Sequence, residues 1–415
     1  MEYRPKSVTG TPNPDDVARC VVAHWASLAA SAGDDGFSVV AGVVAVDGDS
    51  LTVVACASGC KCVGALPEDD RGFRVRDAHA EVLARRGLVA VLLEDVLRLA
   101  TPGAAAPVLL AAAAPDGLGR AVALKQGVAL HFYCSAAPCG DAAIYELDGG
   151  AAAAYTGAKL GDWRRESDPQ RLGATRLKPG RSDVAEGRRT CSLSCTDKLC
   201  QWWLHGLEGQ LLSHWVQPIR LASIVVGLCD ARATQEAQLA ALRRGLQHRA
   251  AGFARRLGFE AAADVELAVT AVVPACALRR ASSRPAPLGV AWWLGCADPD
   301  ILLAAAGVRR GATAKAIAAQ RLAARSRLAR AALFEKFEAI IAVDRPRSLG
   351  ENASIDACKA AAPGRAARLA LRALLLEDFP ASFHEQHRKR RRADTIPPEY
   401  GPTVLKPSPA ACAIL

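Results

Sequence analysis

The stretch DAHAEVLARRGLVAVLLEDVLRL, residues 77–99, combines the start of a long helix with two side chains that can bind a metal and move protons. His79 stands immediately before this helix and Glu81 lies in its first turn, where the helix N-terminus contributes a positive potential. Helical spacing predicts one buried apolar stripe made of Val82, Leu83, Val89, Leu92, Leu93 and Val96. We therefore expect an imidazole and a carboxylate to meet at the start of a core helix.

Two cysteines further along complete a metal-binding pattern. Cys139 follows the apolar run Val128–Cys134, and Cys195 precedes a second helical segment. One imidazole and two thiolates can hold zinc and leave a fourth position for water, while a carboxylate moves protons. Each motif alone is weak, but the ordered combination is specific. His79, Cys139 and Cys195 are the predicted metal ligands and Glu81 the catalytic group of a nucleobase deaminase.

The choice of Cys195 depends on a departure from the commonest deaminase pattern. Pro-Cys-x-x-Cys would place a cysteine at position 142, where this chain has Ala142. We interpret Cys191 and Cys200, which flank Cys195, as unliganded. The pair Cys60 and Cys62 lacks a partner pair in the sequence and is also interpreted as unliganded.

Composition limits the class of protein. A net charge of +10 and a pI near 9.0 favour a polyanionic partner such as nucleic acid. The N-terminus lacks a signal-peptide pattern, and no run of 18 apolar residues predicts a membrane helix. The 14 cysteines are too scattered for a small disulfide framework and indicate a reducing compartment. Those in apolar runs are expected to be buried small hydrophobes, namely Cys20, Cys56, Cys229, Cys276 and Cys296.

The order of elements predicts an α/β layered domain. We expect helices over residues 15–31, 80–99, 140–147 and 194–212, strands over 39–46, 51–56, 128–134 and 221–227, and further helices over 312–340 and 356–378. The alanine-rich segments 103–115 and 149–154 are expected to be loops. Residues 161–192 are expected to form a long basic loop that either grips RNA or is simply a solvated charged loop. The tail 384–415 is basic, then Pro-rich, and is expected to be disordered.

The motifs around His79, Cys139 and Cys195, together with the segments 178–183, 206–209 and 326–334, resemble the RNA adenosine deaminase (editase) family. The similarity runs over about residues 15–383 and is greatest to the members that act on tRNA. The resemblance implies a cytidine-deaminase-like three-layer α/β/α sandwich with a C-terminal helical extension. It also implies zinc-dependent conversion of adenosine to inosine in tRNA, at the adenosine 3′ of the anticodon of alanine tRNA.

The resemblance assigns further roles by position. Glu81 is the general acid and base for attack of water on adenine C6, and Gly59 and Lys61 are substrate contacts. A buried inositol hexakisphosphate is implied, bound or linked to zinc by Asp77, Arg85, Arg86, Lys198, Trp202, Arg330, Lys359, Arg365 and Arg368. The competing interpretation of Arg85 and Arg86 is a charge pair that faces solvent.

Alternatives to this function remain. One is a catalytically inactive RNA-binding subunit that keeps zinc for structure, and another is a deaminase of mRNA adenosine or of cytidine. Residues 388–392, RKRRR, suggest a nuclear localisation element or an RNA-attracting arm. The terminal Cys412-Ala413-Ile414-Leu415 fits a prenylation box, which we interpret as a chance match. We expect a monomer in the nucleus or cytoplasm, with no membrane partner.

Overall fold

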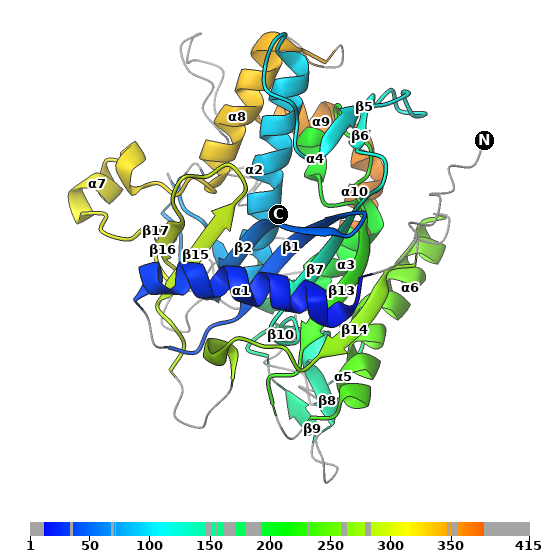
Figure 1. Cartoon of the computed structure of the whole chain (residues 1–415), viewed down its shortest axis with the longest axis vertical. Coiled ribbons are helices and arrows are strands. Elements are labelled where there is room, and N and C mark those ends of the chain that lie inside the picture. The colour runs from blue at the N-terminus through cyan, green and yellow to red at the C-terminus, as the bar shows by residue number, and fades with distance from the viewer. Residues whose placement is uncertain are drawn as a thin grey trace.

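The computed structural model describes residues 12–33, 36–67, 70, 72–146, 152–154, 156–160, 171–178, 192–230, 233–258, 264–278, 284–346, 349 and 355–376. At its centre is an eight-stranded sheet in the order β14-β13-β7-β1-β2-β15-β16-β17 (Figure 1). In that order the strands are Glu266–Thr270, Leu221–Gly227, Val128–Cys134, Val40–Asp47, Ser50–Ser58, Leu288–Trp293, Asp300–Leu303 and Val308–Arg309. The strands predicted at 128–134 and 221–227 are confirmed to the residue.

The sheet is mixed. β13 runs parallel to β7 and to β14, whereas the other pairs in this sheet are antiparallel. β1 and β2 form the predicted hairpin, which turns at Gly48 with a φ of 58°. Since parallel neighbours need a crossover, the chain between β7 and β13 must leave the sheet and return. That crossover carries the helix that begins at Cys195.

Alternation along β1 separates two apolar faces. Val40, Val44 and Val46 pack with helix α1 (Pro14–Ala32), which crosses one face of the sheet (Figure 1). Ala41, Val43 and Ala45 belong to the larger cluster on the other face, together with helix α2 (Ala80–Ala100). Because successive strand residues point to opposite sides, one all-apolar strand serves both layers. The predicted three-layer α/β/α sandwich is confirmed.

The face that α2 covers also carries the remaining helices of the core. They are α3 (Cys195–His205), α4 (Gly209–Leu212), α5 (Gln235–Leu242), a π-helical turn named η3 (Arg243–His248) and α6 (Arg249–Leu257). The C-terminal helices are α7 (Ala314–Ala318), α8 (Arg330–Val343), α9 (Ile355–Ala361) and α10 (Arg365–Leu375). α8 packs on α2, with Phe334, Phe337 and Ile340 buried in the common core.

Several local predictions were wrong. Residues 140–147 do not form a helix: a 3₁₀ turn at Asp141–Ala143 leads into strand β8 (Ile144–Glu146). The partner of β8 is β9 (Ala152–Ala154), inside a predicted loop, because pairing in the fold outweighs the low strand propensity of alanine. The predicted helix 194–212 is two helices, since Gly206 has a φ of 88° and ends the first.

Short strands form the rest of the described structure. β3 (Cys60–Cys62) pairs with β4 (Asp77–His79), and β5 (Leu110–Ala112), within the other predicted loop, pairs with β6 (Val122–Leu124). The predicted basic loop contributes β11 (Arg176–Lys178), which lies between β10 (Lys159–Leu160) and β12 (Ser192–Leu193). The rest of that loop, residues 161–170 and 179–191, and the tail from 377 onward lie outside the described residues.

Within the described part of the chain, no helix combines the length and apolarity needed to cross a membrane. Of the cysteines expected to be buried, Cys56 and Cys229 are, whereas Cys20, Cys276 and Cys296 are half-buried. All the described cysteines are free thiols.

Candidate active site

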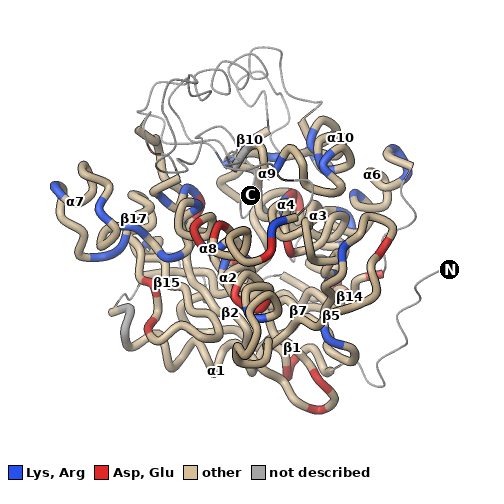
Figure 2. Tube along the Cα trace, turned by 90° about the horizontal axis from the view of Figure 1, so that it is seen from above, with Lys and Arg blue, Asp and Glu red and all other residues tan. Residues whose placement is uncertain are grey.

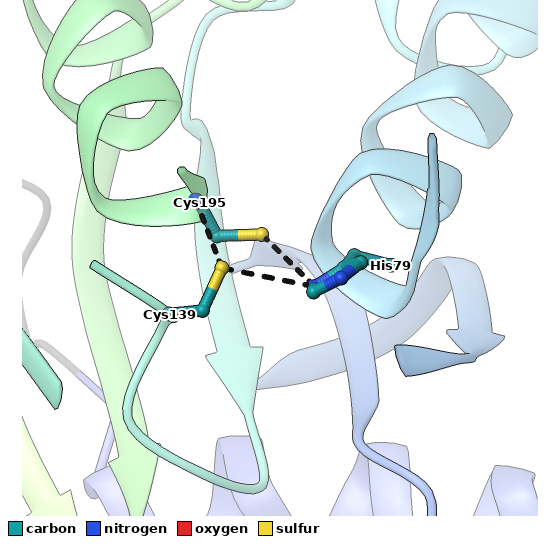
Figure 3. A group of neighbouring side chains, drawn as sticks. All are labelled: His79, Cys139 and Cys195. Atoms are coloured by element: carbon teal, nitrogen blue, oxygen red, sulfur yellow. Dashed lines mark hydrogen bonds between the residues drawn. The ribbon is translucent and has the colours of Figure 1, made fainter. Parts of the chain in front are cut away.

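The three predicted metal ligands meet at one point (Figure 3). The Nδ1 atom of His79 lies 3.8 Å from Sγ of Cys139 and 3.6 Å from Sγ of Cys195. The backbone N–H of Cys195 donates to Sγ of Cys139 over 3.4 Å. An imidazole nitrogen and two sulfurs at these separations can share one metal ion.

Two of the three candidate ligands stand at the ends of regular elements. His79 ends β4 and caps α2, while Cys195 is the first residue of α3, whose N-cap Ser194 accepts a hydrogen bond from the N–H of Asp197. Cys139 lies on the loop after β7, and not at a helix start as predicted. The loop that follows the carboxyl end of β7 thus carries Cys139 to the start of α3.

The two cysteine loops are fitted closely together. Gly140 has a φ of 116°, and a Cβ there would lie 2.2 Å from Oγ of Ser194, so only glycine fits. The Thr196 hydroxyl donates to Pro138 O over 2.9 Å, and the Thr196 N–H donates to Cys139 O over 3.0 Å. These contacts set the separation of the two sulfurs.

Glu81 lies in the first turn of α2, and burial together with the nearby Glu81 charge raises the pKa of the Cys195 thiol. The Glu81 side chain is 2% exposed, and its Oε2 atom has no hydrogen-bond partner among the described residues. Burial and the neighbouring Glu81 carboxylate raise the pKa of the Cys134 thiol. A buried carboxylate oxygen without a partner is costly unless a ligand or water completes it. This atom can therefore accept a proton in the site.

Lys178 is a site residue that the sequence interpretation placed only in the RNA-gripping loop. Its Nζ atom lies 2.8 Å from Oδ2 of Asp77 and 3.1 Å from Sγ of Cys195, and its side chain is buried. The same Asp77 oxygen accepts from Nζ of Lys198 at 2.5 Å and from the Ser192 hydroxyl at 2.9 Å. Strand β11 thus brings a second ammonium group to the metal site.

The electrostatics follow from this grouping. Burial opposes the charge of Asp77, but Lys178 and Lys198 outweigh it and hold the Asp77 pKa well below its usual value. A hydrogen bond with Cys195, followed by the charges of Lys178 and His79, lowers the pKa of Cys139 and offsets its burial. A thiol that ionises readily supplies the thiolate, which is the form that binds metal.

Cys62 is closer to the site than its sequence indicated. It pairs with Asp77 across β3 and β4, and its sulfur lies within 4.8 Å of ligand atoms of Asp77 and His79. Burial, and then the Asp77 charge, raise the pKa of the Cys62 thiol. Asp77 already accepts two ammonium groups, so the group with Cys139 and Cys195 is the better metal centre.

The predicted substrate contacts lie next to the histidine. Gly59 has a φ of 150°, and a Cβ there would come within 2.0 Å of Ala78 O. The Ala80 N–H donates to Gly59 O over 3.0 Å, which ties this loop to the start of α2. Lys61 is half-buried on β3 opposite Ala78. Their roles toward a nucleotide stay predictions.

Several of the cations predicted for a polyphosphate are buried. Arg85 is 4% exposed, lies with its guanidinium 5.5 Å from the Trp202 ring centre, and donates to Leu207 O over 3.0 Å. Arg86 is half-buried and donates to Leu328 O over 2.7 Å, next to the start of α8. Neither faces solvent, which contradicts the interpretation as a solvated charge pair.

Other members of the set come from α3, α8, α9 and α10. Lys198, Arg330 and Lys359 are buried, and Arg368 pairs with Oε1 of Glu208 at 2.7 Å. Burial, aided by the charges of Arg86 and Arg368, lowers the pKa of Arg85 to about 9 despite Glu208. Buried cations in excess of their carboxylates suit a polyanion. Arg365 is exposed, with its guanidinium 3.5 Å from Ala360 O.

An α/β sandwich with one histidine and two cysteines around a point, and a glutamate two residues after the histidine, is the arrangement of the zinc-type nucleobase deaminases. The chain belongs to the adenosine-deaminase (editase) domain family, whose sequence profile matches residues 55–378.

Curated relatives carry two kinds of name. The chain is 31% identical over 235 residues to "tRNA-specific adenosine deaminase 1" of Drosophila melanogaster, and the aligned region is 51% of this chain and 52% of the relative. It is 32% identical over 198 residues to the protein of that name in Mus musculus, covering 45% and 38%. It is also 32% identical over 202 residues to "Double-stranded RNA-specific editase Adar" of Drosophila melanogaster, covering 46% and 29%. The matches span about half or less of each relative's length.

Proposed function

We propose that this protein is a zinc-dependent adenosine deaminase that converts adenosine to inosine in tRNA. The observation that carries the proposal is the convergence of His79, Cys139 and Cys195 beside the unpartnered Oε2 of Glu81. Family membership supports adenosine as the base. The reaction consumes water and releases ammonia, so the carbonyl oxygen of inosine comes from water.

The chain's residues divide the chemistry. His79, Cys139 and Cys195 would hold Zn²⁺, which supplies the Lewis acidity that lowers the pKa of water at the open position. Glu81 takes a proton from water and passes protons to adenine N1 and to the leaving ammonia. Lys178 stabilises the Cys195 thiolate over 3.1 Å and keeps Asp77 ionised. Asp77 accepts the His79 N–H over 3.1 Å and so fixes the histidine backbone.

A buried polyanion completes the proposal, with inositol hexakisphosphate as the expected molecule. Arg85, Arg86, Lys198, Arg330, Lys359 and Arg368 come from five helices and would share its phosphates, with Trp202 packed under Arg85. Lys198 also reaches Asp77, so it would link the polyanion to the metal site. Release of the phosphorylated inositol on denaturing purified protein, measured by mass spectrometry, tests this part.

The choice of tRNA rests on similarity and charge. Two of the relatives above are named for tRNA, and the chain carries a net charge of +10. Figure 2 shows Lys and Arg along β17 and α7 on one side, and on α10 and α6 on the other. Basic segments of this kind can bind a phosphate backbone without reading its sequence. We propose the adenosine 3′ of the anticodon of alanine tRNA as the target.

Deamination of double-stranded RNA is the second candidate, because the relatives include double-stranded RNA editases at similar identity. The test incubates the zinc-loaded protein with an alanine tRNA transcript, an mRNA-like duplex and a cytidine-containing single strand. We expect inosine in the tRNA alone. Inosine in the duplex only would show that the substrate is double-stranded RNA. Uridine in the single strand would show that the base is cytidine. If zinc is bound and no product forms, the protein is an inactive subunit.

A further inference from the structure

The two cysteine ligands share a sequence pattern, because each is followed two residues later by an aspartate. The pairs are Cys139 with Asp141 and Cys195 with Asp197. Both aspartates are 0% exposed. Buried carboxylates need charged or hydrogen-bonding partners, and here both find an arginine from one short segment of chain.

Arg244 holds the Cys139 loop. Its Nε atom lies 3.0 Å from Oδ2 of Asp141, and its Nη2 atom donates to Asp141 O at 2.8 Å and to Ile144 O at 2.6 Å. The other carboxylate oxygen of Asp141 accepts from the Gly173 N–H over 2.7 Å. One guanidinium thus joins both ends of the 3₁₀ turn that follows Cys139.

Arg249 holds the Cys195 loop. Its Nη1 atom lies 2.6 Å from Oδ1 of Asp197, and its Nη2 atom donates to the Thr175 hydroxyl over 2.9 Å. The Oδ2 atom of Asp197 accepts from the Ser194 hydroxyl at 2.5 Å and from the Arg176 N–H at 3.0 Å. Arg249 therefore ties the start of α3 to β11, the strand that carries Lys178.

The π-helical turn explains how one segment reaches both loops. Arg244 lies in η3 and Arg249 is the next residue after it. In an α-helix, residues five apart point about 140° away from each other, because each turn takes 3.6 residues. The wider turn of a π-helix, with its i→i+5 bonding, brings such residues closer to the same side of the helix, and π-turns are frequent at functional sites.

Gly245 lets this turn approach the site. A Cβ at Gly245 would lie 3.0 Å from both the Ala142 N atom and Cγ2 of Thr196. Ala142 belongs to the Cys139 loop and Thr196 to the Cys195 loop, so the turn packs into the seam between them. The two arginines flank this seam and reach one loop each.

We propose that Arg244 and Arg249 are positioning residues that set the distance and orientation of the two thiolate ligands, Cys139 and Cys195. This inference rests on the proposed zinc site, but it does not depend on the substrate. Neither arginine touches a ligand atom; each acts through the aspartate two residues after the cysteine. Groups that orient metal ligands in this way typically change metal affinity by about 10–100-fold when removed.

The test uses Arg244→Gln and Arg249→Gln, with Arg249→Lys as the conservative variant and Arg243→Gln as the control. Arg243 is exposed in the same turn. Zinc affinity is measured by chelator competition, and cobalt-loaded protein gives the thiolate charge-transfer and d–d bands. We expect about 10–100-fold weaker zinc binding and shifted cobalt bands in both Gln variants, an intermediate effect for Arg249→Lys, and none for Arg243→Gln.

The effect on zinc binding can be distinguished from a loss of folding and from a failure of the proposed function. Circular dichroism identifies variants that fold, and if Arg249→Gln does not, Arg244→Gln and Arg249→Lys still test the proposal. Wild-type zinc affinity and cobalt bands in folded Arg244→Gln and Arg249→Lys would overturn it. If the wild-type protein binds zinc as described but forms no inosine, the proposed function fails and this inference stands.

Discussion

Lys178 offers the sharpest test of the energetics of the site, because its ammonium group is buried between Asp77 and Cys195. We predict that Lys178→Met lowers the free energy of unfolding. Each charge-assisted hydrogen bond contributes about 1.5–3 kcal/mol, and breaking a buried ion pair costs about 3–5 kcal/mol. Lys198 stays on the same Asp77 oxygen, so the loss should lie at the low end, at about 3 kcal/mol.

The assay is urea unfolding of the zinc-free protein, followed by tryptophan fluorescence. Lys159→Met is the matched control, because Lys159 is exposed on β10 directly opposite Leu177, the residue before Lys178. Its free energy of unfolding should change by less than about 0.5 kcal/mol. Asp77→Asn and the double variant complete a cycle, and we expect the two substitutions to be strongly non-additive. If Lys178→Met and Lys159→Met behave alike, the assignment of Lys178 to the site is wrong.

Glu81→Gln should keep its zinc, measured by elemental analysis, while inosine formation falls by about 10²–10⁴-fold or more; equal activity would remove Glu81 from the chemistry. Burial lowers the pKa of His131 to about 4 from 6.5, so the unfolded chain binds a proton more tightly and stability is lost as pH falls from 6.5 toward 4. Relative to His131→Asn, the wild type should lose about 2 to 3 kcal/mol between pH 7 and pH 4.5 in urea titrations, and parallel curves would contradict this. Gly140→Ala should weaken zinc binding and stability more than Gly119→Ala, because both have a positive φ but only Gly140 meets neighbouring atoms; equal effects would show that backbone strain alone acts.

Elements whose sequence carries one strong pattern of apolar residues were predictable from the sequence. β7 and β13 are mostly apolar runs, and their bounds and those of α2 agree with the structure within a residue. The single apolar stripe predicted for α2 was wrong, because the helix is buried on nearly all sides, with Glu81, Arg85 and Asp95 buried and Val89 only half-buried. The grouping of His79, Cys139 and Cys195 was predictable for a different reason, since few chemistries need a histidine, a nearby glutamate and two cysteines in this order.

What was missed depends on contacts distant in sequence. Nothing local distinguishes Lys178 from the other cations of its basic segment, and only the pairing of β11 with β12 brings it to Asp77. The helix predicted at 140–147 gives way to a turn because Asp141 is held by Arg244, 103 residues away. The roles of Arg244 and Arg249 follow from a π-turn, which has no recognisable signature in this sequence.

The central claim is that this site hydrolyses adenosine in RNA to inosine. The most direct measurement is the reaction of zinc-loaded protein with alanine tRNA in water enriched in ¹⁸O, followed by mass spectrometry of the nucleosides. We expect inosine that carries ¹⁸O, formed by the wild type and not by Glu81→Gln. Adenosine that remains unchanged in zinc-loaded wild type, or inosine without the label, would refute hydrolytic deamination at this site.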